Sequence, residues 1–259
     1  MAPNCTTIPE PTTLKDALEF AAALSDGNLK EQVGQQLEKR VASKSWVSVE
    51  KDSVKTIFVS VVKHMVSLLK AIKSNANDYG KYSHLKTSGD HAEKCIETVV
   101  DFLPRLMARL HATLNYLWYN VDSDGGIYGR GKWKDQTAND THSSSNDETL
   151  RSWLRGDEIP QIKPDSPFDA ELPGGFNEPS KLTFSRGSEL AKPVRDLVER
   201  GNGTLTNLIR AIIVLLPSDS ATTTTVIGST LGMVGVAGLA AAAYFSNSFG
   251  IASAIATLF

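Results

Sequence analysis

The stretch FLPRLMARLHATLNYLWYNVD, residues 102–122, decides the fold class of this protein. Its leucine, methionine and tryptophan residues recur at steps of three and four, which places them along one face of an α-helix. The pattern begins upstream at Ile96, so we predict one long helix over about 90–121. Pro104 lacks a backbone N–H and is expected to kink this helix or split it in two.

The same spacing of apolar residues predicts helices on both sides of this stretch. We expect them after Thr13, from Leu29 on, over 51–74, after Glu148, over 188–200 and over 203–216. Two capping boxes, Thr13-Leu-Lys-Asp16 and Ser145-Asn-Asp-Glu148, precede helices. In the helix over 51–74 we expect an apolar face directed inward, and Lys55, Lys63, Lys70 and Lys73 elsewhere on its surface.

The segments between these helices are rich in glycine, proline, asparagine, aspartate and serine, which is typical of loops. Loops are predicted over 75–89, 122–147 and 156–187, and no convincing strand pair or internal repeat occurs. The sequence therefore predicts an all-α protein, an irregular helical bundle with long loops. This helical domain occupies residues 1–217 and includes a loop-rich region over 122–187.

The C-terminal part differs, because no charged residue follows Asp219 up to Phe259. Its centre, VIGSTLGMVGVAGLAAAAYF over 226–245, is long enough as a helix to cross a hydrocarbon core of about 30 Å. We predict a polar linker over 218–225, a membrane helix over 226–245 and an apolar tail over 246–259. The side chains expected to contact the lipid bilayer include Val226, Leu231, Met233, Val236, Leu239, Tyr244 and Phe245.

Three interpretations of this segment compete. The first is a single membrane span, in which the G-x-x-x-G pair Gly228 and Gly232, followed by Gly235 and Gly238, packs against a partner helix. The second is a signal for a glycolipid anchor attached at Ser218 or Ser220. The third is a soluble helical hairpin, which the long charge-free run disfavours. Since no charge follows the segment, its orientation in a membrane is not predicted.

A glycine-rich loop, GGIYGRGKW over 125–133, resembles the phosphate-binding pattern G-x-x-x-x-G-K-[ST]. That loop works between a strand and a helix, and its last residue binds magnesium through a hydroxyl. Here a predicted helix precedes the loop, no helical pattern follows it, and Trp133 has no hydroxyl. We therefore predict no nucleotide binding, and expect Trp133 and Tyr128 to pack on the bundle.

Other signals of chemistry are weak. The net charge of −2 argues against a general nucleic-acid binder. The chain has two cysteines, Cys5 and Cys95, for which we expect free thiols, with one disulfide as the alternative. His91 and Cys95 are four residues apart on a predicted helix, but a structural zinc site needs four ligands. No catalytic triad pattern occurs, so we predict no enzyme, metal or cofactor.

Three triplets fit the pattern for N-linked glycosylation: Asn4-Cys-Thr6, Asn139-Asp-Thr141 and Asn202-Gly-Thr204. Such triplets are frequent by chance, and the pattern alone assigns them no function. The first thirteen residues have no basic start and no apolar run, so a cleavable signal peptide is not predicted.

Several stretches in order along the chain resemble the secreted-antigen family of Babesia-type piroplasm parasites. They are TIPEPTTLKDALEFAAAL at 7–24, NDYGKYSHL at 77–85, the stretch at 102–122, GKWKDQT at 131–137, RSWLRG at 151–156, LPGGF at 172–176 and SRGSELAKPVRDLV at 185–198. The tail with AAYFSNSFG at 242–250 resembles the tails of that family and of the related variant erythrocyte surface antigens.

This resemblance implies a multicopy, non-enzymatic surface or secreted antigen that takes part in host–parasite interaction or immune exposure. It implies a host-cell or parasite surface protein as partner, and a location at the parasite or infected-cell membrane. Relatives often carry more cysteines, and export would need an unconventional or internal signal. The alternative is a tail-anchored adaptor whose helical domain faces the cytoplasm.

Overall fold

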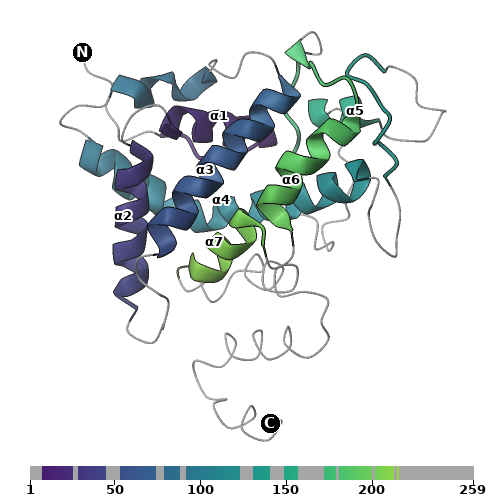
Figure 1. The fold of residues 1–259 in the computed structure, drawn as a ribbon. Coiled ribbons are helices and arrows are strands. Elements are labelled where there is room, and N and C mark those ends of the chain that lie inside the picture. The colour runs from purple at the N-terminus through teal and green to yellow at the C-terminus, as the bar shows by residue number, and fades with distance from the viewer. Residues whose placement is uncertain are drawn as a thin grey trace, which may run out of the picture.

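The structure is a computed structural model that describes residues 8–25, 29–44, 53–73, 79–87, 92–122, 131–140, 149–156, 172–178, 181–199, 202–212 and 215. Helices dominate these residues, and their one β-bridge pairs Lys73 with Leu182 outside any strand (Figure 1). The helices are α1 (Leu14–Ser25), α2 (Leu29–Ala42), α3 (Ser53–Ile72), α4 (Ala92–Val121), α5 (Leu150–Arg155), α6 (Ala191–Val198) and α7 (Thr204–Ile212). The described residues also form two 3₁₀ helices, η2 (Gly80–Thr87) and η5 (Gly187–Leu190). The all-α prediction is confirmed for this part of the chain.

The two longest helices, α3 and α4, organise the core. In Figure 1, α3 runs diagonally across the front of the bundle and α4 runs behind it. Each of the four helices α1, α2, α6 and α7 contacts both α3 and α4. The apolar face predicted for α3 points inward as expected, since Val54, Phe58, Val61, Met65, Leu68, Leu69 and Ile72 are buried.

Pro104 was expected to kink helix α4 or split it in two; the helix is continuous through Pro104, so the split does not occur. The leucine stripe explains the continuity. Leu103, Leu106, Leu110, Leu114 and Leu117 are fully buried. Each buried leucine contributes about 1.5–3 kcal/mol, and together they outweigh a proline cost of about 3 kcal/mol.

Two local predictions need correction. The segment over 75–89 was expected to be a loop, but it contains η2, which packs against α1 through buried Tyr82 and Phe20. Helix α5 begins after Thr149, not after a capping box at 145–148. Thr149 and Ser152 form a reciprocal capping box of their own, because a serine hydroxyl can replace the carboxylate in this motif.

The start of α1 is held by a distant segment, residues 172–176. The first two N–H groups of α1, on Leu14 and Lys15, donate to the carbonyl oxygens of Pro173 and Gly174 at 2.7 and 3.0 Å. A Cβ atom on Gly174 would lie 2.1 Å from the carbonyl oxygen of Leu154. Only glycine therefore allows this segment to pass between α5 and the N-terminus of α1.

Candidate functional site

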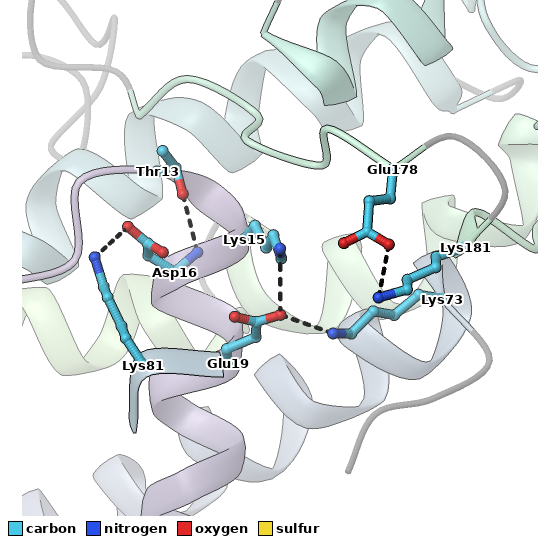
Figure 2. A network of polar contacts seen from close by, with 8 residues as sticks. All are labelled: Thr13, Lys15, Asp16, Glu19, Lys73, Lys81, Glu178 and Lys181. Carbon is cyan, nitrogen blue, oxygen red and sulfur yellow. Dashed lines mark hydrogen bonds and ion pairs between the residues drawn. The ribbon is translucent and has the colours of Figure 1, made fainter. Parts of the chain in front are cut away.

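A buried ion pair joins the first and third helices. Glu19 of α1 accepts a hydrogen bond from the Lys73 ammonium at 2.7 Å, and both side chains are almost fully buried. Lys15, one turn earlier on α1, lies 3.9 Å from the same carboxylate oxygen (Figure 2). Lys73 was expected on the surface, and that expectation is wrong. Its position at the end of α3, next to the bridge with Leu182, turns the side chain into the bundle.

A second ionic contact lies at the edge of this network. Asp16 accepts from the Lys81 ammonium at 2.8 Å, and the Asp16 N–H donates to the Thr13 hydroxyl at 3.0 Å (Figure 2). This is one of the two hydrogen bonds of the predicted capping box; the Asp16 carboxylate accepts from the N–H of Thr12 at 3.3 Å. Burial alone would raise the pKa of Asp16. The hydrogen bond and charge of Lys81, with hydrogen bonds from Thr12, outweigh burial and lower that pKa below its ordinary value.

Carboxylates and ammonium groups such as these also occur in catalytic sites, but here their burial gives them a structural role. The Glu19 carboxylate is 4% exposed and the Lys73 ammonium side chain 2% exposed, so a substrate cannot contact the pair. Nearby, burial and the carboxylates of Asp16 and Glu19 raise the pKa of Tyr82 far above its ordinary value, which keeps the phenol protonated. The network therefore connects α1, α3 and η2.

The glycine-rich loop ends in an aromatic cluster. Trp133 is fully buried, with its ring 5.7 Å from Tyr116 and 5.5 Å from Trp153. The backbone N–H of Trp133 donates to the backbone carbonyl oxygen of Asn120 at 2.8 Å. The Lys132 ammonium, which a phosphate loop would direct at a nucleotide, lies 4.7 Å from the Trp133 ring centre. The prediction that Trp133 packs on the bundle is confirmed, and Tyr128 lies outside the described residues.

A polar cluster of His111, Asn115 and Thr206 lies between α4 and α7. His111 Nε2 is 3.1 Å from the Thr206 hydroxyl oxygen, and that hydroxyl donates to the Val198 carbonyl at 3.1 Å. With the hydroxyl hydrogen used in this way, the imidazole Nε2–H is the donor to Thr206. The Asn115 amide then donates to Nδ1 at 3.0 Å. The neutral ring is thus fully hydrogen-bonded, whereas a proton on Nδ1 would face another donor.

Stability is expected to depend on pH through His111. Burial, and to a lesser extent the positive charge of Arg210, lowers the pKa of His111 from 6.5 to about 4. Below pH 6.5 the unfolded chain binds a proton that the folded chain does not, so the stability present at neutral pH is lost as the pH falls toward 4. The expected loss between pH 8 and pH 5 is about 2 kcal/mol.

Urea denaturation at a series of pH values measures this loss. The side chain of the variant His111→Gln stays neutral at every pH, so the loss of stability between pH 8 and pH 5 that comes from His111 should disappear. The variant is also expected to be less stable than the original protein at pH 8. Equal slopes of stability against pH for the two proteins would contradict the prediction.

Cys95 on α4 is fully buried and disulfide-bonded. Cys5, the other cysteine of the sequence, lies outside the described residues. The expectation of two free thiols is therefore wrong. The disulfide also removes Cys95 as a zinc ligand, and no metal-binding group of three or more His, Cys, Asp or Glu occurs among the described residues.

One surface groove of about 360 Å³ lies between the C-terminal end of α2 and the middle of α4. Arg40 and Asp101, which both line it, form an ion pair. Its lining residues are Arg40, Ser43, Lys44, Val100, Asp101, Pro104 and Leu215. Leu215 is the last described residue, so this end of the bundle is the one from which the chain continues toward the C-terminus.

The predicted membrane segment over 226–245, with its lipid-facing residues and its four glycines, lies outside the described residues. Within the described part, none of the helices combines the length and the hydropathy that crossing a membrane requires. Compared with protein-family models, with curated proteins and with solved structures, the chain matches none of them.

Proposed function

We propose that this chain is a non-enzymatic helical antigen of a parasite, exposed at a cell surface or secreted, and associated with a membrane through its C-terminal apolar segment. The disulfide at Cys95 is the observation that carries the proposal. Disulfides persist in oxidising compartments, on secreted proteins and on cell surfaces, and are rare in the cytosol. The bond therefore favours an exported domain over the alternative of a cytoplasmic, tail-anchored adaptor.

The polar clusters of the domain support a non-enzymatic role. The strongest charged pair, Glu19 with Lys73, is buried against water, and His111 makes hydrogen bonds on both ring nitrogens inside the bundle. Lys132 lies against aromatic rings in the loop that resembles a phosphate site. These side chains support the fold, and the surface of the domain is left for interaction with another protein or for immune exposure.

Surface staining tests the location. An antibody against residues 156–187 is applied to intact, unfixed cells that carry the protein, with and without a phospholipase that cleaves glycolipid anchors. Staining that resists the enzyme is expected for a membrane span with the helical domain outside. Staining lost on treatment would indicate a lipid anchor and still support surface exposure. Staining that requires permeabilisation would contradict the surface location.

Thiol labelling of the same material tests the observation on which the proposal rests. The protein is denatured and treated with an alkylating reagent before and after reduction. Cys5 and Cys95 are expected to react only after reduction. If both react without reduction in protein from its natural cells, the domain resides in a reducing compartment and the cytoplasmic adaptor becomes the better interpretation.

A further inference from the structure

We infer that Asn139 and Asn202 carry N-linked glycans; this inference rests on the proposed export of the domain. Each begins a triplet with threonine at the third position, the pattern that N-glycosylation requires. The structure adds that both asparagines are exposed and that both lie in turns between helices. A glycan is bulky and hydrated, so only an acceptor with these two properties is compatible with the folded domain.

Asn139 lies in the turn that follows Trp133. Its N–H donates to the Thr137 hydroxyl at 3.3 Å, and its carbonyl accepts from Arg151 of α5 at 3.2 Å. These backbone contacts hold the turn while the exposed side chain points away from the core. The contact with Arg151 places Asn139 beside α5, which lies at the upper right of Figure 1, whereas α7 lies at the lower centre.

Asn202 lies in the tight turn between α6 and α7. Gly203 follows it, and a Cβ atom there would lie 2.5 Å from the Leu197 carbonyl oxygen, so the turn closes only with glycine. The Thr204 hydroxyl donates to the Asp196 carbonyl at 3.2 Å and lies 3.1 Å from His64 Nδ1. In the folded domain the hydroxyl of this triplet is thus engaged inside the turn. The glycan on Asn202 is therefore added before α6 and α7 pack together.

The disulfide at Cys95, which carries the proposed export, supports this inference through the same secretory route. Disulfide formation and N-glycosylation both occur on chains that pass through an oxidising secretory compartment. A domain with a disulfide-bonded Cys95 and two exposed acceptor turns has the properties of a chain that follows this route.

Enzymatic release of N-linked glycans from the protein isolated from its natural cells tests the inference. Release in heavy-oxygen water converts each modified asparagine to a mass-tagged aspartate, which peptide mass spectrometry locates. Tags at residues 139 and 202 are the expected result. An untagged asparagine at either position, in a peptide that is detected, overturns the assignment for that residue.

Matched variants distinguish the asparagines that carry a glycan from those that do not. In the producing cells, Asn139→Gln and Asn202→Gln should each remove one step of the gel-mobility shift, and the double variant should remove both. Asn177→Gln is the control, since Asn177 is exposed but is followed by Glu178 and Pro179 without a hydroxyl. Thr204→Ser keeps the hydroxyl and should keep the glycan on Asn202.

Together with surface staining, these experiments distinguish a failure of the glycosylation inference from a failure of the proposed function. Unmodified protein that still stains on intact cells would overturn the glycans and leave the surface antigen in place. Modified protein that stains only after permeabilisation would support the glycans and overturn the surface location. Unmodified protein with free thiols would overturn both.

Discussion

Replacing Glu19 with alanine is expected to destabilise the domain by about 3–5 kcal/mol, because it removes the carboxylate to which a buried ammonium donates. Lys73 holds that ammonium 2.7 Å from Glu19, with 2% of its side chain exposed. Transfer of a charged group into a protein interior is costly, and the partner of opposite charge offsets that cost. Urea denaturation followed by helical circular dichroism measures the change.

The chain contains a control pair of the same chemistry. Glu178 and Lys181 also meet at 2.7 Å, but more than half of each side chain is exposed (Figure 2). Glu178→Ala should therefore change stability by no more than about 1 kcal/mol. The double variant Glu19→Leu with Lys73→Met removes both buried charges and should be markedly more stable than Glu19→Ala. Similar losses for Glu19→Ala and Glu178→Ala would contradict this account.

Trp133→Ala is expected to have an effect of similar size, about 3–5 kcal/mol, because it leaves a cavity in a fully buried aromatic cluster. The ring contacts Tyr116 and Trp153, and the backbone beside it is tightly packed. A Cβ atom on Gly187 would lie 2.0 Å from the Trp133 carbonyl oxygen, so η5 covers this residue closely. The neighbouring segments cannot close over the cavity without moving the loop-rich region.

Tyr119→Ala is the matched control, since Tyr119 is an aromatic residue of α4 with 37% of its surface exposed. Its loss should be well below that of Trp133→Ala. The two variants are compared by their denaturation midpoints in urea. If Trp133→Ala unfolds at the same urea concentration as the original protein, Trp133 does not anchor the loop-rich region to the bundle.

The positions of the helices follow from local pattern. The apolar stripes over 102–122 and 51–74 predicted α4 and α3 to within a few residues, because a period of 3.6 is repeated many times in a long helix. The Thr13 cap of α1 was predictable for a similar reason, since hydroxyl and carboxylate act within one turn. The η2 segment was missed because its glycine and tyrosine residues carry no periodic signal.

The candidate sites depended on contacts that no local pattern contains. Glu19 lies on the helical face next to apolar residues, yet its partner Lys73 is 54 positions away. His111 and Thr206 are 95 positions apart, and only their packing shows that the imidazole is buried and neutral. The glycosylation triplets were visible in the sequence, but exposure was needed to separate usable acceptors from chance matches.

The sequence by itself determined that this protein is helical, which faces its long helices bury, and that its last forty residues carry no charge. Those properties depend on residue type and on spacing within a few turns. Only the tertiary structure decided that Lys73 is buried and that Cys95 is disulfide-bonded. Each of these depends on which distant segment reaches the same point in space, and helical periodicity does not encode that pairing.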